Sequence, residues 1–95
     1  MLVYRGVLPP EVAGSIAHLP PGIKRSIKGA LRALMENPAI GDALHSELEG
    51  CFKYRARRYR IVFQVARSAR TLRILAVGHR RNVYEELAEQ LKKRE

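Results

Sequence analysis

The sequence has no tryptophan and one cysteine, and aromatic residues make up only 6% of its 95 positions. The single Cys51 excludes a disulfide within the chain and is expected to be a small buried hydrophobe. No apolar run approaches the roughly 20 residues that a transmembrane helix needs, so we expect no membrane span. The first residues also lack the basic and then apolar pattern of an export signal. Together these absences favour a cytoplasmic location.

Acidic residues are absent from residues 51–84, and this gap is the most informative feature of the composition. The segment carries ten of the 18 lysines and arginines and none of the nine carboxylates. The formal net charge of +9 is therefore concentrated in about one third of the chain. Positive charges without counter-ions repel one another, and proteins usually tolerate this repulsion where a surface meets a polyanion. We interpret the segment as a surface that faces nucleic acid.

The first residues predict a strand followed by a short helix. Residues 2–8 favour a strand that stops at Pro9, because proline cannot donate to a ladder. Pro10 suits the first position of a helix that ends near Leu19, where Pro20-Pro21-Gly22 forces a turn.

The next segment has the clearest helical period in the chain. From residue 23 to residue 36, apolar residues recur at every third or fourth position, which is typical of a helix with one apolar face. Asn37-Pro38 ends this helix, because the residue before a proline is pushed out of the helical region. The two helices are expected to form an antiparallel hairpin. Residues 39–50 have no clean period and predict a loop with at most one helical turn.

The second half of the chain predicts consecutive strands. From residue 51 to residue 56 apolar and basic residues alternate, which places cations on the face opposite the core. After a turn at Arg57-Arg58, residues 59–66 are apolar on both faces, as in a central strand. This alternation predicts a basic hairpin with one buried face.

A last strand and a helix complete the predicted fold. The strand covers residues 71–77, and Gly78 is expected to break it. Residues 84–91 have the period of an amphipathic helix. We therefore expect one α+β domain over residues 1–95, with a small antiparallel sheet packed on an N-terminal helical hairpin in the order β-α-α-β-β-β-α.

Several short motifs in the sequence, taken in this order along the chain, resemble those of a known family. They are a tight turn before YRIVFQV, a strand that ends in VGHR and continues into NVY, and a helical hairpin ending in Asn-Pro. With them the chain resembles the RelE/ParE superfamily of toxins from toxin–antitoxin systems. The resemblance covers essentially the whole chain. It implies a small sheet on a helical hairpin, a RelB-like antitoxin as partner, and no cofactor.

The two branches of that superfamily imply different activities. The RelE branch is similar to ribosome-dependent mRNA interferases, whereas the ParE branch poisons DNA gyrase. Resemblance to the RelE branch would place the family's catalytic positions, with His79 beside them, at Lys53, Arg55, Arg60, Arg80 and Tyr84. One feature departs from the family: a Gly-Asp or similar turn commonly precedes the Tyr-Arg pair there, and Arg57-Arg58 occupy that place here.

The residues of the basic segment favour a metal-independent reaction on RNA. The segment has no carboxylate pair and no His/Cys cluster at metal-ligand spacing, so we expect no metal. The remaining mechanism uses the RNA 2′-hydroxyl as nucleophile and needs a base, an acid and a cationic clamp. Lys53 is the candidate base, because neighbouring guanidinium groups disfavour its charged form while arginine stays protonated. Arg60 and Arg80 suit the clamp. Tyr84 is expected to orient the hydroxyl or to stack on a base, and His79 to protonate the leaving 5′-oxygen.

Each assignment has a plainer structural alternative. Lys53 and Arg55 also suit the solvated edge of a sheet, where charge prevents pairing with other chains. His79 suits a position that bonds to backbone at the end of a strand. Tyr84 stands at the head of an apolar helical stripe, where a core position is common. Further contacts with RNA are expected from Arg57, Arg58 and Arg81.

The expected function is that of a toxin of a type II toxin–antitoxin system. We predict a ribosome-dependent endoribonuclease that cleaves mRNA and is neutralised by a cognate antitoxin. The alternative is a ParE-like toxin that inhibits DNA gyrase without cleaving RNA. An RNA-binding module without catalysis is a third interpretation.

Overall fold

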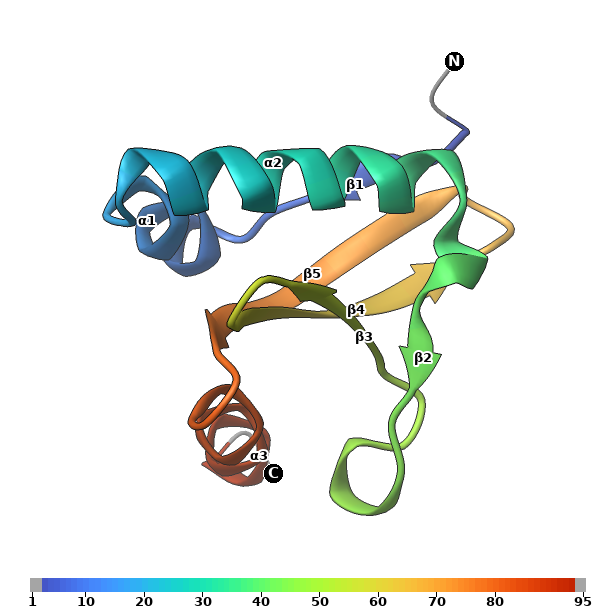
Figure 1. Cartoon of the computed structure of the whole chain (residues 1–95). Helices are drawn as coiled ribbons and strands as arrows, with labels where there is room; N and C mark the ends of the chain where they lie inside the picture. Colours follow the sequence, from blue (N-terminus) through green and yellow to red (C-terminus); the bar gives the residue numbers. More distant parts are fainter. Residues whose placement is uncertain (1–2, 94–95) are drawn as a thin grey trace.

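The computed structural model describes residues 3–93, which form a five-stranded sheet between two layers of helix (Figure 1). In chain order the elements are β1 (Arg5–Val7), α1 (Pro10–Ala17), α2 (Pro21–Glu36), a 3₁₀ turn (Pro38–Ile40), β2 (Asp42–Ala43), a second 3₁₀ turn (Ser46–Leu48), β3 (Phe52–Ala56), β4 (Tyr59–Ala66), β5 (Thr71–His79) and α3 (Val83–Lys93). Helices α1 and α2 cover one face of the sheet, and α3 covers the other. The expected α+β class is confirmed.

Helices α1 and α2 begin where the prolines predict. Pro10 and Pro21 occupy the first turns, where a helix has no use for the missing N–H. The apolar stripe of α2 is buried through Ile27, Ala30 and Leu34. In Figure 1, α1 is seen almost end on while α2 lies across the view, so the helices cross and do not run antiparallel. Crossing lets each helix place its own apolar side on the core.

Strand β1 is shorter than expected and runs parallel to β5. Its ladder pairs Arg5 with Thr71 and Val7 with Arg73, and the sheet order is β1-β5-β4-β3-β2. The sheet is therefore mixed, and the prediction of a purely antiparallel sheet is wrong at this edge. Side-chain alternation indicates which face a residue occupies and says nothing about the direction of a distant partner strand. Leu2, the first residue of the predicted strand, lies outside the described residues.

Residues 39–50 contain a short strand that the sequence did not predict. The two residues of β2 pair with the first two residues of β3 and extend the sheet by one strand. The chain reaches this edge because Gly41 has no side chain: a Cβ at this position would lie 2.6 Å from Cζ of the buried Phe63. The rest of the segment consists of loop and the two 3₁₀ turns.

The sheet buries an apolar cluster on each face. In β4, Ile61, Val62 and Phe63 are all 0% exposed, which confirms the prediction of a central strand that is apolar on both sides. The cluster under α1 and α2 contains Val12, Ile16, Ile27, Ala30, Leu34, Ala56, Ile61, Phe63, Leu72 and Ile74. The cluster under α3 contains Leu48, Cys51, Val62, Val83 and Leu87. The predicted burial of Cys51 is therefore confirmed.

A β-bulge in β5 changes which side chains face which helices. The pairing with β4 skips Leu75, so that two consecutive residues, Leu75 and Ala76, both pack against the α3 cluster. An extra residue of this kind reverses the alternation of every residue that follows it in the strand. The faces of residues 77–79 are therefore set by the bulge.

Gly78 does not break β5, contrary to the prediction. It pairs with Arg60, and the strand continues to His79. A Cβ on Gly78 would lie 3.3 Å from Cβ of Val83, in the first turn of α3. The glycine therefore lets the helix approach the sheet closely at this point.

The close contact at Gly41 predicts a specific loss of stability. Gly41→Ala should destabilise the chain by about 1–3 kcal/mol, because its Cβ would overlap the ring of Phe63. Gly29→Ala is the matched control: it lies in the exposed surface of α2, nothing is within 4 Å of its new Cβ, and it should stabilise the chain by about 0.5–1 kcal/mol. Urea unfolding of the two purified variants tests both signs. Equal stabilities would contradict the role of Gly41.

Candidate functional site

One end of the sheet carries a row of cations on the face that α3 covers. Arg55 on β3 pairs directly with Arg60 on β4, and Arg60 pairs with Gly78 on β5. Lys53 lies on the same face of β3, opposite Val62 of the α3 cluster. We call Lys53, Arg55 and Arg60 the cationic face. None of them has an acidic partner among the described residues, so the facing cations repel each other.

Arg60 is fixed in place by the turn between β3 and β4. Its Nη1 donates to the carbonyl of Tyr59 at 2.9 Å and to the carbonyl of Arg57 at 3.0 Å. These bonds hold a half-buried guanidinium at the end of the sheet. Both bonds use Nη1, so the remaining N–H groups of the guanidinium can interact with the Tyr84 hydroxyl or bind phosphate oxygens.

Tyr84, in the first turn of α3, packs against the cationic face. Nζ of Lys53 lies 6.0 Å from the centroid of its ring, at the outer limit of a cation–π contact. The Tyr84 hydroxyl is buried and interacts with the guanidinium of Arg60, but it makes no hydrogen bond of good geometry with the described side chains. Burial raises the pKa of Tyr84 above its ordinary value of 10.0, and the cation of Arg60 opposes this rise. The hydroxyl therefore stays protonated at neutral pH.

Arg80 reaches the side of the cationic face because of the bulge. Its backbone N–H donates to the carbonyl of Arg58 at 2.8 Å, which extends the β4–β5 pairing by one residue. Strand alternation then places Arg80 on the face of Gly78, which is the face of Arg60. Its side chain is exposed. A strand without the bulge would have placed position 80 on the side of α1 and α2.

His79 lies on the opposite face from Lys53, Arg60 and Tyr84. It pairs with Tyr59, and the two rings meet edge to face with their centroids 5.8 Å apart. Nδ1 of His79 accepts a hydrogen bond from the backbone N–H of Arg81 at 3.3 Å, which leaves the proton of a neutral ring on Nε2. The structure thus does not bring His79 beside Tyr84 as the sequence analysis expected. The reversed alternation after the bulge is the reason.

The three further arginines expected to contact RNA are exposed at this same end of the sheet. Arg57 and Arg58 form a two-residue loop between the paired residues Ala56 and Tyr59, and Arg81 follows β5. Arg57 has a φ of +58°, in the left-handed region that favours glycine. The departure from a glycine-containing turn therefore places an arginine in strained backbone.

Tyr59 is a candidate site residue that the sequence analysis missed. Its ring lies between the α1–α2 core, against which it packs, and His79. Its position directly before Arg60 was the available signal, but its contact with His79 depends on the β4–β5 register and hence on the bulge.

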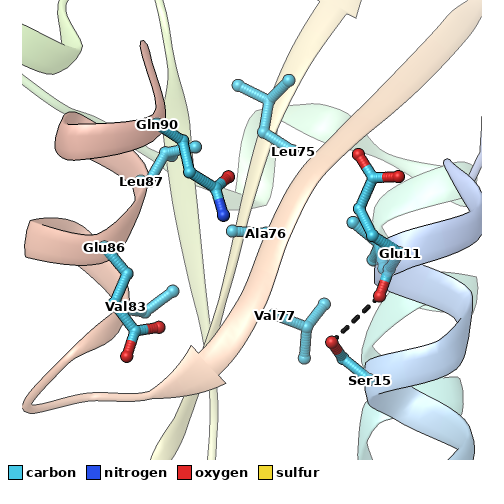
Figure 2. A pocket seen from close by; sticks show the side chains of 10 residues that line it. Glu11, Ser15, Leu75, Ala76, Val77, Val83, Glu86, Leu87 and Gln90 are labelled. Atoms are coloured by element: carbon cyan, nitrogen blue, oxygen red, sulfur yellow. Dashed lines mark hydrogen bonds between the residues drawn. The ribbon is translucent and has the colours of Figure 1, made fainter. Parts of the chain in front are cut away.

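A separate hollow of about 110 Å³ lies between α1 and α3 and does not include the cationic face (Figure 2). Residues 75–77 of β5 line it between the two helices. Glu11 on α1 and Glu86 on α3 bring carboxylates to it, and Ser15 Oγ donates to the backbone carbonyl of Glu11 at 2.9 Å. Carboxylates repel phosphate, so this hollow does not suit a nucleic acid.

Two further properties hold for residues 3–93. Among the side chains that the structure describes, no three from His, Cys, Asp or Glu gather where they could hold a metal ion. No helix in the range is long and apolar enough to cross a membrane.

Comparison with solved structures identifies the fold. The chain matches the toxin–antitoxin complex RelBE2 from Mycobacterium tuberculosis with a TM-score of 0.75 and 27% identity, over 83% of this chain and 93% of that one. It matches a mutant of the Escherichia coli toxin RelE in the free state with a TM-score of 0.75 and 22% identity, over 99% and 98% of the two chains. It matches the RelE–RelB complex from Pyrococcus horikoshii with a TM-score of 0.69 and 19% identity, over 85% and 99%.

Comparison of the sequence with protein families agrees with the fold. No curated protein matches the chain. The family described as the ParE toxin of the type II toxin–antitoxin system parDE matches residues 12–84, which include α2, the cationic face and Tyr84. The chain therefore belongs to the ParE toxin family of type II toxin–antitoxin systems, within the RelE/ParE superfamily.

Proposed function

We propose that this toxin is a metal-independent endoribonuclease that cleaves mRNA on the ribosome. The observation that carries the proposal is the convergence of Lys53, Arg55, Arg60 and Tyr84 on one face, with no acidic partner among the described residues. Cations that no carboxylate neutralises can stabilise the charge that develops on a phosphate in the transition state. Attachment to rigid strands keeps the groups in place, as catalysis requires.

In the proposed reaction, Lys53 removes the proton of a ribose 2′-hydroxyl, and the 2′-oxygen attacks the adjacent phosphorus. The bond from phosphorus to the 5′-oxygen breaks, which gives a 2′,3′-cyclic phosphate and a 5′-hydroxyl end. Arg60 and Arg80 bind the phosphate oxygens as charge accumulates, and Arg55 adds to the positive field. This use of Lys53 requires its amine to be neutral before the step.

Tyr84 is proposed to supply the proton that the leaving 5′-oxygen needs. Its raised pKa keeps the hydroxyl protonated, and it lies on the face of Lys53 and Arg60, whereas His79 does not. The hydroxyl is buried in this structure, so substrate binding must expose it. A small shift of the first turn of α3 away from the cationic face would do so.

A RelB-like antitoxin is the proposed partner. Two of the similar structures are complexes of related toxins with their antitoxins. An antitoxin that covers the cationic face should present acidic side chains to Lys53, Arg60 and Arg80, because opposite charges favour the right partner and exclude others.

Inhibition of DNA gyrase is the second candidate, because the matching family is the ParE toxins. A gyrase inhibitor has no chemical need for a base, a clamp and a protonated hydroxyl on one face. The two functions differ in the first damage seen in cells. On induction from a tight promoter, new mRNA ends should appear before gyrase-linked DNA breaks. Breaks that appear first, with intact mRNA, would establish the gyrase function.

Replacement of Arg80 tests the phosphate clamp. Its side chain is exposed and its only hydrogen bond within the described residues uses the backbone, so Arg80→Ala should leave the fold intact. The single-turnover cleavage rate should fall by about 100-fold or more. Ribosome binding should change little, since the remaining cations still attract the RNA. Arg73→Ala removes an exposed charge near the other end of β5 and should stay within a few-fold of the parent. Equal losses of binding and cleavage in both variants would indicate a docking surface only.

Replacement of Tyr84 by phenylalanine should separate stability from activity. Tyr84→Phe removes a buried hydroxyl that makes no well-formed hydrogen bond and should stabilise the fold by up to about 1 kcal/mol at pH 7, while cleavage falls by about 100-fold. In the parent, the folded state holds the phenol proton more tightly than the unfolded state does. The parent therefore loses stability as pH rises above about 10. The difference in free energy of unfolding between Tyr84→Phe and the parent should increase over that range. Urea unfolding at pH 7 and above pH 10, with single-turnover assays, measures both effects. A less stable or fully active variant would refute the assignment.

A further inference from the structure

A second hollow lies on the opposite face of the sheet from the cationic face. It has a volume of about 370 Å³, and its walls are Ile23 of α2, the Arg57–Arg58 loop, Tyr59 and His79. We call it the Tyr59–His79 hollow. Its size falls within the roughly 300–1,000 Å³ that small-ligand pockets occupy. It stands at the same end of the sheet as the proposed catalytic groups.

The walls of the Tyr59–His79 hollow match the chemistry of a nucleotide. The two rings stand at 73° to each other, so they form a corner with an aromatic surface on one wall and a ring edge on the other. Aromatic rings stack on bases of any sequence. The bond from the N–H of Arg81 leaves Nε2 of His79 as a donor toward a base edge or ribose. Two guanidinium groups at the rim and no carboxylate in the walls favour a phosphate.

The backbone of Arg57 is a second observation that points to a ligand. A φ of +58° costs an arginine on the order of 1 kcal/mol or more, and glycine would avoid that cost. The Arg57 side chain is exposed and makes no bond within the described residues, where only the carbonyl of Arg57 is bonded. A strained arginine that serves no internal contact within the described residues is consistent with a side chain kept for binding.

The loop also connects the hollow to the cationic face. Arg60, on the cationic face, holds the carbonyl of Arg57 at 3.0 Å and the carbonyl of Tyr59 at 2.9 Å. Both carbonyls belong to residues that line the hollow. An extended strand that passes over the two-residue loop would therefore meet Arg60 on one side of the sheet and the hollow on the other.

We propose that the Tyr59–His79 hollow binds one nucleotide of single-stranded RNA next to the nucleotide that is cleaved. The base stacks on the Tyr59–His79 corner, and the phosphate binds Arg57 and Arg58. His79 is thus a residue for substrate positioning and not the acid. This inference rests on the proposed ribonuclease function and names a subsite for the same substrate.

Binding of an RNA that cannot be cleaved tests the subsite separately from the reaction. The probe is a fluorescein-labelled 2′-O-methyl RNA hexamer, whose affinity is measured by fluorescence anisotropy over a range of salt concentrations. His79→Leu should weaken binding by about fivefold or more, as the loss of a stacking surface does. Arg57→Gly should weaken binding and lower the log–log salt slope by about 0.7, since one phosphate contact is lost.

Two controls keep the test decisive. Arg57→Gly relieves the strained backbone and should unfold at a urea concentration no lower than the parent does, so its weaker binding cannot come from unfolding. It also stands as the deciding variant if His79→Leu does not fold. Arg67→Ala removes the same charge at the exposed turn after β4 and should change affinity by less than about twofold.

Several results would overturn the subsite. The first is that Arg57→Gly binds the hexamer as the parent does, or that Arg67→Ala loses as much affinity as Arg57→Gly. The second is that the parent does not bind the hexamer at all. The third is that a hexaglutamate peptide displaces the hexamer from the parent but not from His79→Leu. The last result would assign the hollow to an acidic protein segment. If Arg57→Gly weakens binding while Arg80→Ala leaves cleavage unchanged, the proposed catalytic face fails and the subsite stands. If Arg80→Ala lowers cleavage while Arg57→Gly binds the hexamer as the parent does, the proposed catalytic face stands and the subsite fails.

Discussion

Strand β4 is the element on which the rest of the structure depends. It pairs with β3 on one side and with β5 on the other, and its central residues Ile61, Val62 and Phe63 are fully buried. Both helix layers need its apolar side chains, because Ile61 and Phe63 belong to the α1–α2 cluster and Val62 to the α3 cluster. Arg60 stands where this strand leaves the core. The proposed site is therefore built on the most constrained strand of the sheet and not on a loop, which favours fixed geometry.

The bulge at Leu75 determines which residues meet at that end. It places Gly78, and with it Arg80, on the face of Arg60, and it sends His79 to the face of Tyr59. Neighbouring strand residues lie on opposite faces in any case, and the single unpaired residue determines that His79 and not Arg80 lies on the face of Tyr59. The same arrangement gives α3 room to approach, because the position that faces Val83 is a glycine. One local irregularity therefore sets both the proposed clamp and the neighbouring hollow.

Sequence periodicity predicted the parts of the fold that depend on local contacts. The stripe of α2, the alternation of β3 and the two-sided burial of β4 each follow from which face must be apolar, and the short turns leave β3, β4 and β5 little choice but antiparallel pairing. The parallel direction of β1 and the pairing of β2 depend on partners far along the chain, and no local pattern encodes them. In the site, alternation placed Lys53 and Arg55 on one face. It could not place His79, because Leu75 and Ala76 are ordinary strand residues and nothing in them marks a bulge.

Two arginines have a positive φ, and in each case the backbone carbonyl of the strained residue accepts a hydrogen bond. Arg70, with a φ of +50°, presents its carbonyl to the N–H of Arg5 at 2.9 Å and so secures β1 at one end of the sheet. Arg57, with a φ of +58°, presents its carbonyl to the guanidinium of Arg60 at the other end. The Arg70 carbonyl thus completes the pairing of β1, whereas the Arg57 carbonyl holds the guanidinium of Arg60 beside Arg55. The two like charges of Arg55 and Arg60 repel each other. Strain and repulsion therefore coincide where a phosphate would relieve the repulsion. We infer that this end of the sheet is held ready for a polyanion at the expense of stability.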